Sequence, residues 1–492
     1  VSGKPFTRFI RDELFLPLGV RRSRYGDLTV PDGQFAPAFS DGQRLPREVV
    51  NASASGGLYT TPTELARFLS LFLNEGRFGG KQVLSPASVR LMAENQAVRE
   101  DFRPLAMADG YGLGWDAVGP KAFAALGVEV WRKNGGTATY GADMIVAPGA
   151  GLAVAVMGAS SGFPAATLSE RIMLEALVEQ GTLAAMPPPV EEVAKPAVSR
   201  ARLEAAWFDG VFANATALYR LEPNSAGGAR LLKAEEAGWT PHVENLQPRS
   251  DGSLASEVSR EASYRLLDYR GFTYLVLNAT RRCKLEVRSS LFAQKLPGRG
   301  ELSARWKARV GGTWLQVNEP GDSLFASRAR PFLRLVQYPG LPGHVVVRTE
   351  FGGEAVNQVV DPSQNEYRAL MCLQIPSDEG RDLNDLEVAA RADGEWLRFG
   401  SAVYRPLPTA PNFGVGKHRV KIGPEGNAEW RVLDESGRID IRGCRGWQLF
   451  DREFTPIAGG KDGASGLQAA AAAFLMLRGD PGADIAVACS PA

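Results

Sequence analysis

A proline-rich segment divides this chain of 492 residues into two parts with different patterns. The segment reads MPPPVEEVAKPAVSR from residue 186, and proline at this density favours an extended, semi-rigid backbone. Residues 1–185 mix helix-like and strand-like patterns, whereas the residues after 198 read almost wholly as strands and turns. The sequence therefore predicts a linker over residues 186–198 between an N-terminal α/β domain with antiparallel strands and a C-terminal all-β region.

Three segments of the first part have helical apolar spacing and clear ends. TPTELARFLSLFLNEG places Pro62 in a first turn and Gly76 at the stop, and LSPASVRLMAE has Ser85 as N-cap and Pro86 at the first helical position. The third helix, ATLSERIMLEALVEQG, ends at Gly181. Between the second and third helices, YGLGW, MIVAP and GLAVAVMG predict short buried strands, with PGAG as a hairpin loop.

The C-terminal region predicts two antiparallel, barrel-like β domains, over residues 199–330 and 331–492. Two similar segments, ARVGGTWLQV at 308–317 and ARADGEWLRF at 390–399, suggest duplicated modules that divide near residue 330. The last stretch, ASGLQAAAAAFLMLRGDPGADIAVAC, predicts a helix, a turn and a strand at the end of the second domain.

Charge and hydropathy exclude several classes of partner. Fifty-six basic and fifty-five acidic residues leave a net charge of +1, so no global field gathers nucleic acid or an anionic membrane. The longest apolar stretch, LQAAAAAFLML from Leu467, is shorter than the roughly 20 residues that a membrane-spanning helix needs. The cysteines form no C-x-x-C pair, which favours buried free thiols and leaves the pairing of the last two open. They are Cys283, Cys372, Cys444 and Cys489.

The histidines limit the chemistry of the N-terminal part. His242, His344 and His418 all follow the linker, so residues 1–185 contain no imidazole that could act as a general base or a metal ligand. We expect structural or surface roles for all three.

A G-x-S-x-G pattern, Gly158-Ser160-Gly162 within MGASSGF, offers one candidate nucleophile. An apolar strand precedes it and a helix follows it, as in a nucleophile elbow. An elbow also requires a histidine and an acid, and the histidines lie in the other part of the chain. A polar loop is therefore the favoured interpretation, and an esterase that uses Ser160 is retained as an alternative.

The stretch VWRKNGGTATYGADM offers a second candidate at Lys133-Asn134-Gly135. Glycine beside a strand lets a substrate lie against the edge backbone, and the amine can attract a carboxylate or favour proton loss from a neighbouring hydroxyl. From these residues alone, a β-turn with a solvated lysine is the simpler interpretation.

An ordered series of segments favours the functional interpretation of Lys133-Asn134-Gly135 over the β-turn. VSGKPFTRFIRDELFLPLGV, SASGGLYTTPTELARFLSLFLNEG, LSPASVRLM, YGLGW and KNGGTATYGADMIVAPGAGLAVAVM resemble, in order and spacing, the second half of the serine β-lactamase-like family. That family includes penicillin-binding-protein-like enzymes, class C β-lactamases, D-stereospecific aminopeptidases and esterases. The resemblance covers residues 1–185 and implies acyl transfer on an ester, an amide or a D-amino-acid peptide. It also implies a small-molecule or peptide substrate, no metal or organic cofactor, and a periplasmic or secreted location.

By this resemblance, Lys133-Asn134-Gly135 occupies the third motif of the family, Lys or His, then Thr or Ser, then Gly. Lys133 would stabilise anionic substrate and the proton relay, and Gly136 would supply one backbone N–H of the oxyanion hole. Asn134, Gly135 and Thr137 would contact the substrate. Asn134 departs from the hydroxyl residue of the family, so a hydroxyl contact to a substrate carboxylate is lost.

The nucleophile of the family is the serine of S-x-x-K, and no serine of this sequence is followed three positions later by lysine. We expect that the chain is an N-terminally truncated piece of a serine hydrolase and that it is catalytically inert by itself. A non-catalytic ligand-binding protein on the same scaffold is the alternative from another class. The β-rich remainder is similar in layout alone to the barrel domains of D-aminopeptidases.

Overall fold

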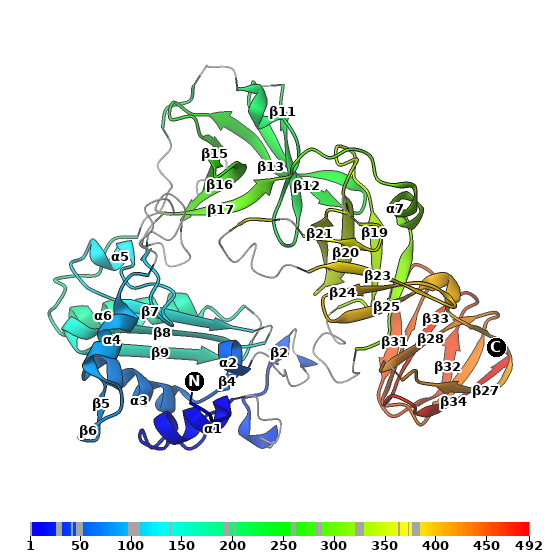
Figure 1. Ribbon diagram of the computed structural model, residues 1–492, viewed down its shortest axis with the longest axis horizontal. Coiled ribbons are helices and arrows are strands. Elements are labelled where there is room, and N and C mark those ends of the chain that lie inside the picture. The colour runs from blue at the N-terminus through cyan, green and yellow to red at the C-terminus, as the bar shows by residue number, and fades with distance from the viewer. Residues whose placement is uncertain are drawn as a thin grey trace. The chain divides into compact units, whose positions relative to one another are not determined.

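The computed structural model divides into two compact units, which Figure 1 traces from blue at the N-terminus to red at the C-terminus. The first comprises Val1–Lys195, Ser259–Ser263 and Leu277–Ser290, and the second comprises Pro196–Val258, Tyr264–Val276 and Leu291–Ala492. The structure describes residues 2–25, 32–40, 43–45, 53–96, 109–137, 139–160, 162–189, 196–199, 203–225, 227–256, 262–280, 285, 287–319, 329–362, 365–371, 373–375, 384–424 and 426–491.

A three-stranded antiparallel sheet of order β7-β8-β9 forms the centre of the first unit (Figure 1). Its strands are β7 (Trp131–Gly136), β8 (Gly141–Ala147) and β9 (Leu152–Gly158). The predicted strands MIVAP and GLAVAVMG are confirmed within β8 and β9, and Gly151 closes the hairpin loop between them in the left-handed conformation.

Helices cover both faces of this sheet. On one face Leu174 packs with Ile145, and on the other Phe72 packs edge-on against Trp131 with ring centroids 6.3 Å apart. Alternation along β7 therefore directs Arg132 towards the first face and Lys133 towards the second. The covering helices are α6 (Ala165–Glu179) on the first face, and α3 (Pro62–Leu73) and α4 (Pro86–Ala93) on the second.

The predicted ends of these helices are confirmed. Thr61 accepts a hydrogen bond from the N–H of Glu64 at the start of α3, and Ser85 accepts one from the N–H of Ser88 at the start of α4. YGLGW, in contrast, is wrong as a strand. Gly114 has φ +84°, and a Cβ on Gly112 would lie 2.3 Å from the carbonyl oxygen of Met92, so this segment forms tight turns.

Shorter elements complete the first unit. Near the N-terminus, a short helix, α1, continues as one π-helical turn, η1. The remaining elements of this part of the chain are α1 (Phe6–Ile10), η1 (Arg11–Phe15), β1 (Arg24–Tyr25), η2 (Asp32–Gln34), β2 (Phe39–Ser40), β3 (Gln43–Arg44), α2 (Ser53–Gly56), β4 (Leu58–Tyr59), β5 (Arg77–Phe78), β6 (Lys81–Gln82), α5 (Lys121–Ala124) and η5 (Pro148–Ala150).

Glu64, in the first turn of α3, ties the N-terminal segment to this helix. Its carboxylate accepts hydrogen bonds from the backbone N–H groups of Arg21 at 2.8 Å and Arg22 at 2.9 Å, and from the hydroxyl of Ser23 at 2.7 Å. Burial alone would raise the pKa of Glu64, but the hydrogen bonds from Ser23, Arg22 and Arg21 outweigh burial and lower it.

We therefore expect Glu64→Gln to destabilise the protein by about 1 to 3 kcal/mol at pH 7, the usual cost of losing hydrogen bonds to a charged group. Because the pKa is lower in the folded state, the carboxylate stabilises the fold above about pH 4.3, the unfolded value. This contribution is lost as the pH falls through the lowered folded pKa. The urea midpoints of wild type and Glu64→Gln should converge as the pH falls from 7 to 3. Glu179→Gln, a control at an exposed position, should leave the urea midpoint unchanged at both pH values. A difference that stays constant with pH would contradict the assignment.

After the linker the chain forms a closed barrel of eight strands, β10 to β17 in chain order, most of which belongs to the second unit. The barrel confirms the predicted antiparallel all-β architecture after the linker. A short 3-10 helix, η6 (Ala205–Trp207), precedes it. The strands are β10 (Phe212–Ala213), β11 (Leu218–Pro223), β12 (Ala229–Glu235), β13 (Gly238–Pro248), β14 (Leu254–Ser256), β15 (Ala262–Tyr269), β16 (Phe272–Thr280) and β17 (Val287–Lys295).

A second sheet of eight strands follows, in the order β21-β20-β19-β18-β25-β24-β23-β22. The predicted division near residue 330 falls inside this sheet, between the hydrogen-bonded neighbours β18 and β19. ARVGGTWLQV and ARADGEWLRF also both contribute strands to it, β18 and β24. Its elements are α7 (Ala304–Arg309), β18 (Thr313–Gln316), β19 (Phe332–Val336), β20 (Val345–Phe351), β21 (Glu354–Val360), β22 (Arg368–Ala369), β23 (Leu386–Arg391), β24 (Gly394–Phe399), β25 (Ala402–Pro406) and η8 (Leu407–Thr409).

The chain ends in a sandwich of a five-stranded and a four-stranded sheet, ordered β26-β28-β33-β30-β31 and β27-β34-β29-β32. Leu449 and Leu475 from the first sheet pack with Ile439 and Ile485 from the second. The strands are β26 (Asn412–Phe413), β27 (Gly416–Lys421), β28 (Ala428–Leu433), β29 (Gly437–Arg442), β30 (Gly446–Phe450), β31 (Pro456–Gly460), β32 (Ala464–Ala469), β33 (Phe474–Arg478) and β34 (Asp484–Pro491).

The predicted C-terminal helix is wrong, because LQAAAAAFLML contributes to β32, a turn and β33. Alanine favours a helix locally, but Ala472 takes φ +61°, which interrupts any helix there. β33 pairs with both β28 and β30, and Leu475 and Leu477 point into the sandwich core. Tertiary burial therefore overrides the propensity of the alanines.

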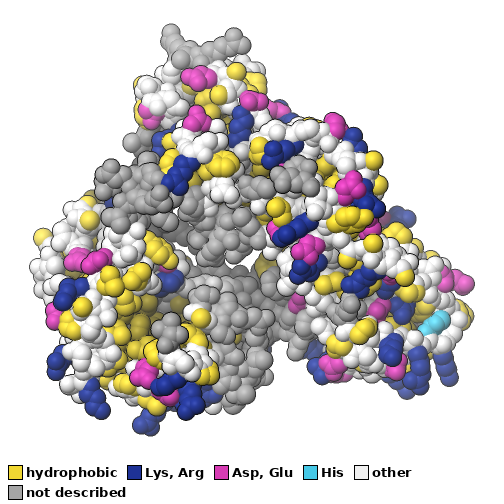
Figure 2. Space-filling model, in the orientation of Figure 1, with side chains coloured by type: hydrophobic (Ala, Val, Ile, Leu, Met, Phe, Trp, Pro, Cys, Tyr) yellow, Lys and Arg dark blue, Asp and Glu magenta, His cyan; other side chains and the backbone are white. Residues whose placement is uncertain are grey.

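Cys444 and Cys489 are buried free thiols, and burial raises the pKa of each. Cys283 and Cys372 lie outside the described residues. Basic and acidic side chains are interspersed over the face in Figure 2, in keeping with the net charge of +1. Within the described ranges, none of the helices combines the length and apolarity that spanning a bilayer requires.

Candidate functional site

The outer edge of β7 carries the residues that the sequence singled out. The backbone N–H of Arg132 donates to the carbonyl oxygen of Ala117 at 2.8 Å, and the backbone N–H of Asn134 donates to Oδ2 of Asp116 at 2.9 Å. Both N–H groups lie on the side away from β8. Because backbone groups alternate along a strand, the N–H of Gly136 faces this same edge. β7 has no further strand partner among the residues that the structure describes.

Lys133 lies in the middle of β7, opposite Met144 of β8, and not in a β-turn or at the start of a strand. Its Nζ donates to Oδ2 of Asp116 at 2.9 Å and to the carbonyl oxygen of Asn134. The side chains of Lys133 and Asp116 are 37% and 33% exposed. The amine is therefore held at the strand edge by a partner that the sequence did not single out.

The two glycines leave the backbone of this edge open. A Cβ on Gly136 would meet no described atom within 4 Å, and one on Gly135 would lie 3.7 Å from the Cβ of Ala142. Packing therefore does not demand glycine here, and a ligand has room to approach the backbone. Thr137 closes the following turn, because its Oγ1 accepts the N–H of Tyr140 at 3.1 Å.

A buried ion network lies beneath the other face of β7. Nε of Arg132 donates to Oδ1 of Asp143 at 3.0 Å, and its Nη1 pairs with Glu170 of α6. Ser169 donates its hydroxyl to Oδ2 of Asp143. All four residues are at least 94% buried, with Arg132 the most exposed at 6%. The network therefore joins β7, β8 and α6 directly behind the candidate edge.

Burial and charge act in opposite directions within this network. Burial disfavours the charged form of Arg132, but attraction from Glu170 and Asp143 outweighs it and raises the pKa of Arg132. Burial raises the pKa of Asp143, against the attraction of Arg132 and the hydrogen bond from Ser169. The guanidinium is therefore firmly cationic, and both carboxylates depend on it for their stability.

Ser160 follows β9 and precedes α6, as the elbow pattern requires, and forms a parallel bridge with Phe39. The first glycine of the pattern has a packing role, since a Cβ on Gly158 would lie 2.3 Å from the ring of Phe163. Ser160 is also absent from the described residues with positive φ. These features favour a structural loop.

Each of the three histidines belongs to the second unit and has local contacts there. Nε2 of His418 lies 2.8 Å from the carbonyl oxygen of Gly414, and the ring of His242 lies 5.5 Å from that of Tyr219. Burial lowers the pKa of His344 and of His242. These contacts agree with structural roles.

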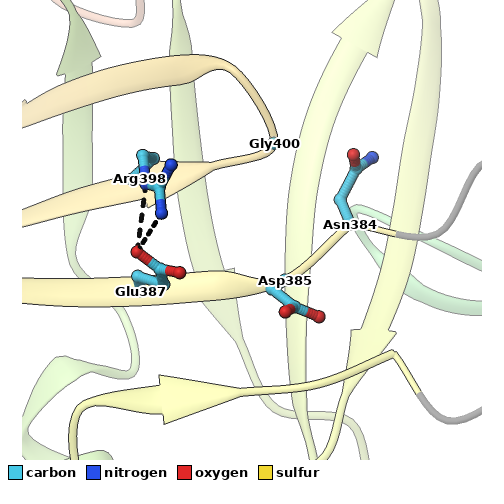
Figure 3. A pocket seen from close by; sticks show the side chains of 5 residues that line it. All are labelled: Asn384, Asp385, Glu387, Arg398 and Gly400. Atoms are coloured by element: carbon cyan, nitrogen blue, oxygen red, sulfur yellow. Dashed lines mark hydrogen bonds and ion pairs between the residues drawn. The ribbon is translucent and has the colours of Figure 1, made fainter.

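A small polar pocket lies beside the hairpin of β23 and β24 (Figure 3). Arg398 pairs with Glu387 across the two strands, through Nε and Oε2 at 3.0 Å, and Asp385 pairs with Arg368. These partly exposed cross-strand ion pairs offer no activated nucleophile. The lining residues are Asn384, Asp385, Glu387, Arg398 and Gly400.

Comparison with solved structures finds partial similarities. The octameric penicillin-binding protein homologue from Pyrococcus abyssi is 16% identical, with 60% of each chain covered and a TM-score of 0.32. SurE is 20% identical, with 59% of this chain and 64% of that chain covered and a TM-score of 0.36. SurE with D-Leu gives 19% identity, 59% and 63% coverage, and a TM-score of 0.37.

Sequence comparisons find two curated proteins and one protein family. Two curated proteins of Mycobacterium tuberculosis, the uncharacterized protein MT1414 and protein Rv1367c, are each 36% identical over 72 residues. Each match covers 13% of this chain and 18% of the length of the curated protein, so the chain spans less than a fifth of the relatives it matches. The Beta-lactamase family matches residues 1–177. These residues contain the three-stranded sheet, the edge of β7, the helices α3 and α4 and most of α6, and they form a Beta-lactamase family domain.

Proposed function

We propose that the edge of β7 is the substrate-binding edge of a serine hydrolase that transfers acyl groups from an ester, an amide or a D-amino-acid peptide. The observation that carries this proposal is the joint presence, at one strand edge, of the Lys133 amine and the outward N–H of Gly136. Membership of the Beta-lactamase family over residues 1–177 supports it.

The chemistry follows from these two groups. Attack on an acyl carbon places negative charge on its oxygen, and a fixed backbone N–H such as that of Gly136 stabilises this charge. The amine of Lys133 adds positive charge near the reacting centre. Gly135 and Gly136 let the substrate backbone lie along the strand, with Asn134 and Thr137 at its borders.

The nucleophile is not supplied by a Ser-x-x-Lys motif of this sequence, because no serine has lysine three positions later. The elbow serine, Ser160, is an alternative nucleophile, with a strand before it and a helix after it.

We expect this chain alone to remain unlabelled by a fluorophosphonate probe, since it carries an oxyanion donor and no activated serine of the family pattern. Mass spectrometry of the intact chain after incubation measures this directly, with an active serine hydrolase as positive control. Stoichiometric labelling at Ser160, lost in Ser160→Ala, would instead establish the esterase alternative.

A further inference from the structure

Asp116 occupies both donors that an anionic substrate group would use at the edge of β7. Its Oδ2 accepts from Nζ of Lys133 at 2.9 Å and from the N–H of Asn134 at 2.9 Å. A cation beside a backbone N–H is a suitable site for a carboxylate. Asp116 already fills that site with a carboxylate from the protein itself.

The backbone on both sides holds Asp116 in this position. Its own N–H donates to the carbonyl oxygen of Arg132 at 2.9 Å, and Ala117 bridges the same residue of β7. Trp115, which is fully buried, packs its ring against that of Trp131 with centroids 6.0 Å apart. The segment therefore runs beside β7 and presents the carboxylate to the next outward N–H.

We propose that Asp116 is a specificity-determining residue that makes this edge reject carboxylate-bearing substrates and accept neutral acyl groups such as amides and esters. This inference rests on the proposed function of the same edge. A second carboxylate would have to compete for Nζ of Lys133 and would face the like charge of Asp116. A neutral carbonyl does not compete for Nζ of Lys133 and is not repelled by Asp116, because it can accept a hydrogen bond from the outward N–H of Gly136.

A purely structural role predicts something different. Exposed ion pairs often contribute little, and Asp116 would then tie one segment to β7 without influence on ligands. The two roles separate when the charge is removed and the hydrogen bond is kept. Asp116→Asn does this, because the amide oxygen can still accept the N–H of Asn134 while the side chain carries no charge.

The test is a titration of the ¹⁵N-labelled chain with N-acetyl-D-alanine and, separately, with N-acetyl-D-alaninamide, followed at the amide signals of Gly135 and Gly136. In the wild type the amide should bind more tightly than the acid. In Asp116→Asn the affinity for the acid relative to the amide should rise about fivefold to tenfold, and the rise should fade at high salt. Lys133→Met, which keeps Asp116 and removes the cation, should leave the acid weak.

A matched control is Glu387→Gln, which breaks the cross-strand pair with Arg398 in the second unit and should leave the ratio unchanged. If both probes shift Gly135 and Gly136 but Asp116→Asn leaves their ratio unchanged, the specificity role is overturned and the proposed function stands. If neither probe shifts these signals in any variant, the proposed function fails and the inference with it. Melting curves show whether Asp116→Asn has lost its fold. In that case the affinity of Lys133→Met for the acid relative to the amide decides the test.

Discussion

Arg132→Met should destabilise the protein by about 3 to 5 kcal/mol, because Asp143 and Glu170 would stay buried without their cation. Methionine preserves most of the side-chain volume, so the loss reports charge and hydrogen bonding more than a cavity. Chemical denaturation followed by tryptophan fluorescence measures it, since Trp115 and Trp131 are packed on the opposite face of the same sheet.

The control for this substitution lies on α6, next to Glu170. Arg171 forms an exposed pair with Glu175 on α6, with side chains 66% and 55% exposed, so Arg171→Met should cost no more than about 0.5 kcal/mol. Replacing Asp143 and Glu170 by Asn and Gln together with Arg132→Met should recover part of the loss. A cost below about 1 kcal/mol for Arg132→Met alone would show that the carboxylates find protons or water in its place.

Lys133→Ala should reduce turnover by about 10² to 10³ in an active enzyme that contains this domain. Loss of one preorganised electrostatic contact at an acyl-transfer centre typically costs on the order of 3 to 4 kcal/mol of transition-state stabilisation. The melting temperature should barely change, because the pair with Asp116 is about one-third exposed and contributes little to folding.

Lys81→Ala, at an exposed position of β6, is the matched control and should change neither turnover nor melting. Wild-type turnover in Lys133→Ala would show that the amine is only a structural partner of Asp116. Loss of turnover accompanied by a large fall in melting temperature would point to the same structural role.

Local signals made the helices of the first unit predictable. Thr61, Ser85 and the prolines after them specify helix starts through contacts within one turn, and the structure has both starts where the sequence predicted them. The alanine-rich C-terminal segment has equally local signals for a helix, yet it contributes two strands. Its conformation depends on partners such as β28 and β30, which no local pattern reveals.

The candidate site likewise contains residues that the sequence indicated and residues whose role depends on distant partners. Resemblance to a family indicated Lys133 and Gly136, but not Asp116, which lies 17 residues before Lys133 and reaches it through the pairing of two segments. Asp143 did carry a signal, since it is a charged residue between the apolar strand neighbours Ala142 and Met144. Glu170 and Ser169 share a helix face with Met173 and Leu177, which could have indicated a buried partner.

The order of the eight-stranded sheet has a consequence for how the chain reaches its native state. β18 to β21 and β22 to β25 are two runs of sequential neighbours. The pairing of β18 with β25 joins them on one side, and an isolated bridge between Asp361 and Leu370 links the ends of β21 and β22. The β18–β25 pairing connects Leu315 with Arg405, so about ninety residues must be looped before it can form. Because such distant contacts slow the crossing of the folding barrier, each run can form its hairpins early. Closure of the β18–β25 seam is then the slow step, and two unpaired inner strands stay open to intermolecular association until it occurs.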